Sequence, residues 1–297
     1  MINAAIDIGS NSILLYIEKD GGKLYDDGEI TKLGSELQNT NKLSELSVKK
    51  SIEVLKKFID ICKKFNTDNI YAVGTMALRA ALNSGEFADK VKNETGITID
   101  IITAEEEARL SYLGAADVLQ NGDLPKTVID IGGGSTEFIN GVGERIINYK
   151  SFNTGILKVT ENFFKKEFID LNYCDSVIGK LSDEFDDWET TNIGSVIGVG
   201  GSITNLASVK LGLEIFEPEK INGLLLTDID IKNLLSLFIS VSEKDRENIR
   251  GLQRGRASTI IAGSTIALAA LRKLNKDCLT VSSKGLRHGL LISKRSS

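Results

Sequence analysis

Two short segments, far apart in the chain, carry the same order of residue types. The first reads IDIGSNS over residues 6–12, and the second reads IDIGGGS over residues 129–135. In each segment an aspartate, Asp7 or Asp130, lies between two isoleucines, and glycine, two small residues and a serine follow. A turn of this kind between antiparallel strands exposes successive backbone N–H groups that can bind an anion, and glycine allows a ligand to approach closely. The pattern therefore predicts two phosphate-binding loops.

The two aspartates indicate that a cation or an ordered water would bind together with the phosphate. Asp7 or Asp130 would repel a phosphate bound beside it, unless a divalent cation or an ordered water lies between them. Mg²⁺ commonly bridges one or two carboxylates and phosphate oxygens. A single copy would be better interpreted as a hairpin turn, because Gly, Ser and Asn favour turns. Two copies, each opening one half of the chain, favour phosphate binding.

The elements around the loops follow a duplicated plan. Apolar periodicity predicts strands before and after each loop and at 69–75, 97–103 and 195–200, and helices at 44–65, 104–119, 201–211 and 253–274. Strands open each half and helices complete it, which indicates a duplicated α/β fold. We expect a domain at 1–122 and a second at 123–297, with a ligand-binding cleft between them and with the last helix able to pack back on the first domain.

Composition excludes several other classes of protein. The net charge is −5 and no basic tract occurs, which argues against nucleic acid as the main partner. The three cysteines form no CxxC pair, so we expect neither a disulfide framework nor a zinc site. The beginning of the sequence does not read as a signal peptide, and no apolar run is long enough to span a membrane. We therefore expect a cytoplasmic protein.

Six motifs, in order, carry a resemblance to a known family. They are AAIDIGSNSILLYI (4–17), GTMALRAALN (74–83), TAEEEARLSYLGA (103–115), VIDIGGGSTEF (128–138), GVGGSITNLA (198–207) and GRASTIIAG (255–263). Together they resemble the exopolyphosphatase / guanosine pentaphosphate phosphohydrolase family, within the actin / sugar kinase / heat-shock ATPase superfamily. The resemblance implies an α/β fold of two ribonuclease H-like (actin-like ATPase) domains.

The resemblance also implies roles for individual residues. Glu107 matches the catalytic base, and Asp130 and Glu137 match residues near the metal or the attacking water. Asp7, Asp130 and Glu137 are the implied metal ligands. The implied substrate-binding residues are Gly9, Ser10, Asn11, Ser12, Arg79, Gly132, Gly133, Gly134, Ser135, Thr136 and Arg256.

Plainer interpretations of some of these residues stay open. Glu105, Glu106 and Glu107 also suit the N-terminus of a helix, and Arg79 also suits a surface ion pair. The position in the first repeat that matches Glu137 is Leu14. The first half is therefore expected to hold phosphate, and the second half to set up the chemistry.

The activity implied is magnesium-dependent release of orthophosphate from inorganic polyphosphate, with room for a monovalent cation and a homodimer. From the acidic charge and the end of the sequence at residue 297 we expect a preference for short polyphosphate chains. Hydrolysis of guanosine pentaphosphate is the alternative that the motifs leave open. More distant alternatives are an ATP-dependent kinase or acyl-phosphate enzyme, a non-catalytic sensor of polyphosphate or alarmone, and a filament protein.

Three features depart from known patterns. Ser258 and His288 stand where the family often has aspartate and glutamate, and His288 is expected to be a surface or packing residue. The GVGGSITNLA motif follows a predicted strand, but Ile203 occupies the place of the third glycine of a dinucleotide-binding loop. Its role stays open.

Overall fold

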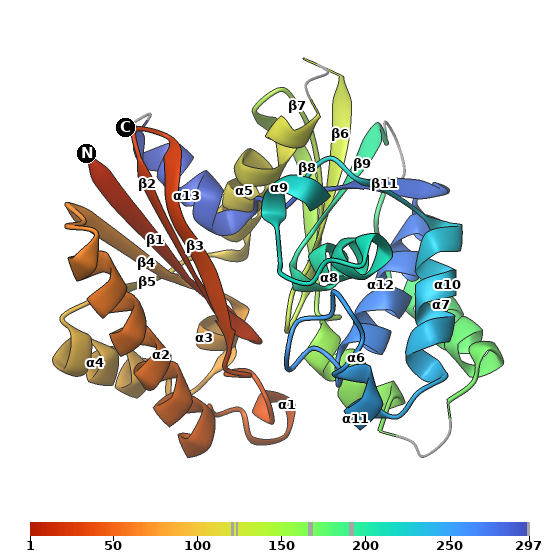
Figure 1. The fold of residues 1–297 in the computed structure, drawn as a ribbon, viewed down its shortest axis with the longest axis horizontal. Coiled ribbons are helices and arrows are strands. Elements are labelled where there is room, and N and C mark those ends of the chain that lie inside the picture. The colour runs from red at the N-terminus through yellow and green to blue at the C-terminus, as the bar shows by residue number, and fades with distance from the viewer. Residues whose placement is uncertain (120–121, 123, 166–168, 190–192, 296–297) are drawn as a thin grey trace. The chain divides into compact units, whose positions relative to one another are not determined.

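A computed structural model describes residues 1–119, 122, 124–165, 169–189 and 193–295 of the chain. These residues form two compact units (Figure 1). Unit 1 comprises Met1–Gly114 and Leu286–Ser297, and unit 2 comprises Ala115–Gly285. The boundary expected from the sequence, between residues 122 and 123, touches a position outside the described residues.

Unit 1 is built on a sheet with the order β3-β2-β1-β4-β5 among its described residues. Strands β1 (Ile2–Ile8), β2 (Ser12–Lys19) and β3 (Gly22–Ile30) form an antiparallel meander. Strands β4 (Asn69–Gly74) and β5 (Ile99–Ile101) extend the sheet in parallel beside β1. The first predicted phosphate loop is the short turn between β1 and β2.

Helices cover both faces of this sheet, as the alternation of residues along β1 requires. Ala4, Ile6 and Ile8 belong to the core cluster that also contains α2 (Glu45–Lys64) and α4 (Ser84–Thr95). Ala5 belongs to a second cluster, with α5 (Ala104–Ala115) and α13 (Leu286–Arg295). Because successive residues of a strand point to opposite faces, these two clusters lie on opposite sides of the sheet. Two short helices, α1 (Leu37–Thr40) and α3 (Met76–Ala80), complete the unit.

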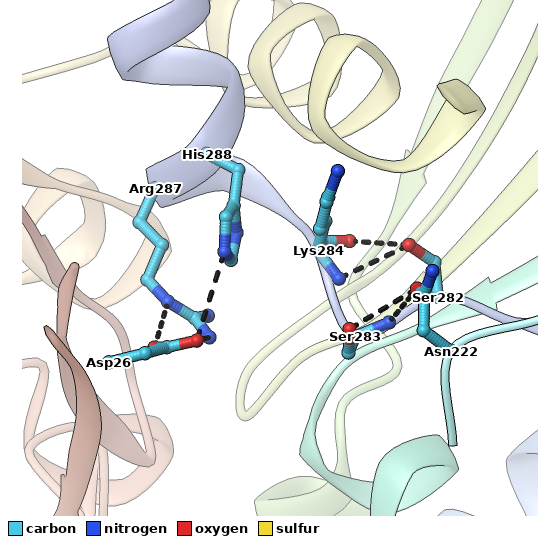
Figure 2. A network of polar contacts seen from close by, with 7 residues as sticks. All are labelled: Asp26, Asn222, Ser282, Ser283, Lys284, Arg287 and His288. Atoms are coloured by element: carbon cyan, nitrogen blue, oxygen red, sulfur yellow. Dashed lines mark hydrogen bonds and ion pairs between the residues drawn. The ribbon is translucent and has the colours of Figure 1, made fainter. Parts of the chain in front are cut away.

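The C-terminal helix α13 lies against β1 and β2, although it is the last element of the chain (Figure 1). Figure 2 shows its main polar attachment: Arg287 donates from Nε and Nη2 to the two carboxylate oxygens of Asp26, at 3.0 and 3.2 Å. His288 is buried, with its ring 4.2 Å from that of Tyr16 and its Nε2 3.8 Å from Asp26. His288 is therefore a packing residue and not a surface one.

Unit 2 repeats the topology of unit 1 around a sheet with the order β10-β11-β9-β6-β7-β8 among its described residues. Strands β6 (Pro125–Ile131), β7 (Thr136–Val142) and β8 (Arg145–Phe152) form the second antiparallel meander. Strands β9 (Ser195–Val199) and β11 (Cys278–Val281) follow in parallel, and β10 (Leu225–Thr227) pairs antiparallel with β11. The second predicted phosphate loop joins β6 to β7, as the first joins β1 to β2.

The helices of unit 2 surround one large apolar core. They are α6 (Ile156–Phe163), α7 (Leu171–Glu184), α8 (Gly201–Leu211), α9 (Pro218–Ile221), α10 (Asp228–Ile239), α11 (Glu243–Arg246) and α12 (Ile260–Lys273), with the 3₁₀ turn η1 (Ala116–Val118). Four aromatic rings, Phe138, Phe152, Phe185 and Trp188, contact one another in this core. Ser283, which lies in the segment after β11, donates from its N–H and Oγ to the side-chain oxygen of Asn222, at the end of α9 (Figure 2).

The structure confirms the predicted duplicated α/β fold and corrects the extent of two helices. The helix predicted at 104–119 ends as α5 at Ala115 and is followed by the 3₁₀ turn η1. The helix predicted at 44–65 is α2, but the helix predicted at 253–274 begins only at Ile260. Gly255, which lies inside the predicted range, has a positive φ of 79° that an α-helix does not accommodate. Within the described ranges, no helix is both long and apolar enough to cross a membrane.

Candidate active site

The two glycine-containing loops have the same internal geometry. The N–H of Gly9 donates to the carbonyl of Ser12 at 3.0 Å, and the N–H of Gly132 donates to the carbonyl of Ser135 at 2.9 Å. In each loop a Cβ added to that glycine would lie 3.1 Å from the accepting oxygen. Such a contact is tighter than side chains normally make, so both positions favour glycine for the same steric reason.

The first loop is held by the segment that follows β3. The N–H of Gly34 donates to the carbonyl of Ser10 at 2.8 Å. The N–H groups of Thr31 and Lys32 both donate to the carbonyl of Asn11, at 3.0 and 2.9 Å. Ser10 and Asn11 are buried, so the loop is a fixed part of unit 1.

The second loop is held in the corresponding way by residues 151–157, the segment that ends β8 and begins α6, which we call the supporting segment. Ile156 and Leu157 donate their N–H groups to the carbonyls of Gly132 and Gly133, at 3.1 and 2.9 Å. Gly155 approaches so closely that a Cβ there would overlap the backbone of Gly133 and Gly134. The supporting segment therefore fixes the shape of the second loop.

The carboxylates beside the loops differ between the two units. Asp130 on β6 lies directly opposite Glu137 on β7, whereas Asp7 on β1 lies directly opposite Leu14 on β2. Residues that face each other across antiparallel strands project from the same side of the sheet. Unit 2 thus has two neighbouring carboxylates at its loop, and unit 1 has one.

Unit 1 brings together two of the predicted residues, Arg79 and Glu107. Arg79 Nη1 lies 2.6 Å from Glu107 Oε2 and also donates to the carbonyl of Ile102 at 3.0 Å. The two side chains are 24% and 12% exposed, so this ion pair is largely shielded from solvent. Arg79 therefore does form the ion pair that its plainer interpretation expects, in a partly buried setting, and its role in phosphate binding stays a prediction.

The three glutamates of the first turn of α5 have different environments. Glu105 is exposed, and Glu106 forms a two-pronged contact with Arg109 at 2.7 and 2.8 Å. The hydrogen bond from Arg109 lowers the pKa of Glu106. Glu107 alone of the three pairs with Arg79. The assignment of Glu107 as the base stays a prediction.

Arg256 belongs to the segment before α12, and its guanidinium lies against Gly201, the first residue of α8 and part of the GVGGSITNLA motif. A Cβ at Gly201 would overlap the Arg256 guanidinium, and one at Gly200 would overlap the carbonyl of Ile131 and lie 3.3 Å from Asp130 Oδ1. Gly200 also has a φ of 97°, which favours glycine. Burial lowers the pKa of Arg256 to about 10, so the side chain stays protonated at neutral pH. The motif thus gathers Arg256 and Asp130 at one place in unit 2.

The predicted site residues divide between the two units. Unit 1 contains Asp7, Gly9, Ser10, Asn11, Ser12, Arg79 and Glu107, and unit 2 contains Asp130, Gly132, Gly133, Gly134, Ser135, Thr136, Glu137 and Arg256. Sequence reasoning did not single out Ser151, whose Oγ donates to Glu137 Oε1 at 2.7 Å. Alignment of the third strands of the two repeats would have drawn attention to it.

The donor chemistry of unit 2 fits a hard divalent cation. Over the described ranges, no group of three or more His, Cys, Asp or Glu side chains is gathered to hold a metal. Mg²⁺ usually binds through one or two carboxylates together with water and substrate phosphates, and does not need a cage made by the protein alone. Asp130 and Glu137 supply such a pair of carboxylates. Asp7 is the corresponding carboxylate of unit 1.

Comparison with known proteins shows the class to which this fold and these loops belong. The two-unit α/β fold is that of solved Ppx/GppA family members. The model of the Ppx/GppA phosphatase family matches residues 17–297, so the chain belongs to that family. A crystal structure of the Aquifex aeolicus Ppx/GppA family member is 35% identical, with a TM-score of 0.83, and the match covers 100% of this chain and 98% of that one.

Two curated relatives are longer proteins. The bifunctional 3-dehydroquinate synthase/phosphatase of Fusobacterium nucleatum is 33% identical over 98% of this chain. The guanosine-5'-triphosphate,3'-diphosphate pyrophosphatase of Photobacterium profundum is 28% identical over 99% of this chain. The matches span 46% and 59% of the length of these two relatives.

Proposed function

We propose that this chain is an exopolyphosphatase that hydrolyses the terminal phosphoanhydride bond of inorganic polyphosphate and releases orthophosphate. The observation that carries the proposal is the carboxylate pair Asp130 and Glu137, on adjacent strands at the second glycine loop. A bare carboxylate pair would repel a phosphate chain, so this arrangement is useful where a cation and a polyanion bind together. Membership of the Ppx/GppA phosphatase family supports the same class of reaction.

In the proposed reaction the two loops bind phosphate oxygens through their backbone N–H groups. Glu107 accepts a proton from a water molecule, and the oxygen of that water forms a bond to the terminal phosphorus. The bond from that phosphorus to the bridging oxygen breaks, and the bridging oxygen stays with the shortened chain. Bound Mg²⁺, held by Asp130 and Glu137, would neutralise charge that develops on the phosphate oxygens.

The ion pair between Arg79 and Glu107 adds a step to this proposal. A guanidinium binds phosphate oxygens through several donors at once. A phosphate that engages Arg79 therefore competes with Glu107 for the same N–H groups. Its binding would release the Glu107 carboxylate to accept the proton of the attacking water.

Guanosine pentaphosphate is the second candidate substrate, and one observation favours it. The Photobacterium profundum relative is named as a guanosine-5'-triphosphate,3'-diphosphate pyrophosphatase and matches 99% of this chain. Its reaction would use the same loops and carboxylates, because the bond that breaks is again a terminal phosphoanhydride.

The test is phosphate release from three substrates supplied separately with Mg²⁺: polyphosphate, guanosine pentaphosphate and ATP. We expect release from polyphosphate at the highest kcat/KM, and a loss of at least about 100-fold in the Glu137→Gln variant. Glu144→Gln, an exposed glutamate in the turn after β7, is the matched control and should behave as wild type. Faster release from guanosine pentaphosphate would favour the second candidate, and release from none of the three would refute both.

A further inference from the structure

Ser151 is a hydroxyl placed in line with the two carboxylates of unit 2. It lies opposite Glu137 across β7 and β8, and Glu137 lies opposite Asp130 across β6 and β7. The three residues therefore form one row across three strands, on the same side of the sheet. Ser151 Oγ donates to Glu137 Oε1 at 2.7 Å.

The corresponding row in unit 1 has neither feature. Asp7 lies opposite Leu14, and Leu14 lies opposite Gly28. A side chain at Gly28 would collide with Leu14, because an added Cβ there would overlap the leucine methyl group. The hydroxyl thus occurs in the repeat that has the second carboxylate, and the repeat without that carboxylate has glycine in its place.

Burial of Glu137 makes this hydrogen bond important for the stability of the carboxylate. Glu137 is only 3% exposed, and a buried carboxylate requires donors to offset the loss of water. A donor on an ordered strand also limits the orientations that the carboxylate can adopt. Ser151 opens the supporting segment that holds the second loop through Gly155, Ile156 and Leu157. One continuous stretch of chain therefore fixes both the loop and Glu137.

We propose that Ser151 is a positioning residue that holds the Glu137 carboxylate in the orientation required for hydrolysis, an inference that rests on the function proposed above. Ser151 acts through Glu137 and does not itself contact the reacting atoms. Removal of its hydroxyl should slow the chemical step and leave substrate binding by the two loops in place. A displacement of about 1 Å in such a group can cost on the order of 100-fold in rate.

The experiment compares steady-state phosphate release by wild type, Ser151→Ala, Ser151→Thr and Ser151→Cys. We expect Ser151→Ala to lower kcat by about 10- to 100-fold with little change in KM. Ser151→Thr, which keeps the hydroxyl, should retain most of the activity, and Ser151→Cys, a weak donor, should fall between them. Ser176→Ala, which removes an exposed hydroxyl that donates to the backbone carbonyl of Tyr173 in α7, is the matched control.

A double-mutant cycle separates positioning from a general structural effect. In the Glu137→Gln background, Ser151→Ala should change kcat by less than about 2-fold, because contacting residues that act as a unit are not additive. Wild-type kcat in Ser151→Ala, equal losses in the Ala and Thr variants, or independent effects of Ser151 and Glu137 would each overturn the proposal. If Ser151→Ala does not fold, the Thr and Cys variants carry the same comparison.

The proposal can fail separately from the proposed function. If wild type releases phosphate from none of the three substrates, the proposed function fails, and crystal structures of wild type and Ser151→Ala then decide the role of Ser151. A Glu137 carboxylate that turns away from its wild-type orientation in the variant supports positioning. An unchanged orientation overturns it.

Discussion

At the scale of single residues, the most informative contact is that between Arg79 and Glu107. The sequence motifs assign these two residues separate roles, phosphate binding and proton transfer. In the structure they form one ion pair at 2.6 Å, shielded from solvent. A shielded pair of this kind costs free energy to break unless a new anion replaces the carboxylate. Phosphate is such an anion, so under the proposed function we expect this contact to link substrate binding to release of the Glu107 carboxylate.

Replacement of Glu107 tests this link. We expect Glu107→Gln to lower kcat by about 100- to 10,000-fold, because the amide cannot accept the proton of the attacking water. Substrate binding should persist or tighten, because the amide competes less strongly than the carboxylate for Arg79. Kinetics of phosphate release and equilibrium binding of polyphosphate measure the two effects.

Glu105→Gln is the control for that experiment, since Glu105 occupies the same helical turn and is exposed. Its kcat should match wild type. Normal turnover by Glu107→Gln, or equal losses in the two variants, would contradict the assignment of the base.

Some of these residue-level features were predictable from the sequence, and others were not. The repeated Asp-x-Gly pattern predicted both loops and their shared hairpin setting. Local backbone geometry alone favours glycine in such a turn, so the sequence shows the turn directly. The Arg79–Glu107 pair and the Ser151–Glu137 bond join residues of different elements. No local pattern encodes such contacts, since they depend on how the strands and helices pack.

At the scale of elements, the supporting segment after β8 determines the shape of the second loop. Gly155 has a φ of −109°, which any residue can adopt, so its glycine is required by close approach and not by backbone conformation. The nearest backbone atom, in Gly134, would overlap an added Cβ. The fold of the loop and the start of α6 are therefore interdependent.

Gly155→Ala should accordingly destabilise unit 2 by about 1–3 kcal/mol and raise KM for the phosphate substrate, because the loop must shift to admit a methyl group. Gly179→Ala in α7 is the control, since an added Cβ there meets nothing closer than 3.8 Å. That variant should be neutral or slightly stabilised. Urea unfolding and steady-state kinetics provide the measurements, and a Gly155→Ala protein as stable and active as wild type would contradict the account.

Helix α13 is attached to its sheet by a buried carboxylate with a perturbed pKa. Desolvation raises the pKa of Asp26, and the charge and hydrogen bonds of Arg287 oppose that rise without cancelling it. In the unfolded chain an aspartate has a pKa of about 3.9. The native protein therefore holds the proton of Asp26 to a higher pH than the unfolded chain does.

This difference predicts a pH dependence of stability. The contribution of Asp26 to the free energy of unfolding is fully present below about pH 4 and is lost as the pH rises through the folded-state pKa. Asp26→Asn removes that dependence, while the unpaired Arg287 costs the same amount at each pH. The stability of Asp26→Asn relative to wild type should therefore improve from pH 4 to pH 7.

Urea unfolding at several pH values measures this effect, with Asp60→Asn, an exposed residue of α2, as the control. The free energy of unfolding of Asp26→Asn relative to wild type should increase from pH 4 to pH 7. That of Asp60→Asn relative to wild type should not show this increase. A constant difference for Asp26→Asn would show that the Asp26 pKa is the same in the folded and unfolded chains.

At the scale of the whole molecule, the sequence predicted the duplication, and the structure confirms it. The two sheets share the order of an antiparallel meander extended by parallel strands. Periodicity identified α2 and α5 because their apolar stripes are long and regular. It extended α12 too far toward the N-terminus, because the apolar pattern does not reveal the positive φ angle of Gly255.

The two units differ in the side chains that lie beside their loops. Both loops retain the same internal hydrogen bond, at 3.0 and 2.9 Å. Unit 2 has the additional carboxylate and hydroxyl of Glu137 and Ser151, and unit 1 has the Arg79–Glu107 pair. Unit 1 thus contains the proposed base, and unit 2 contains the carboxylates proposed to hold a cation.

The central claim is that water attacks the terminal phosphorus of a phosphoanhydride. Hydrolysis of polyphosphate in ¹⁸O-labelled water, followed by mass spectrometry of the products, tests it most directly. The account predicts one labelled oxygen from water in each orthophosphate released and none in the shortened chain. Label in the shortened chain, or transfer of the phosphoryl group to an acceptor other than water, would contradict it.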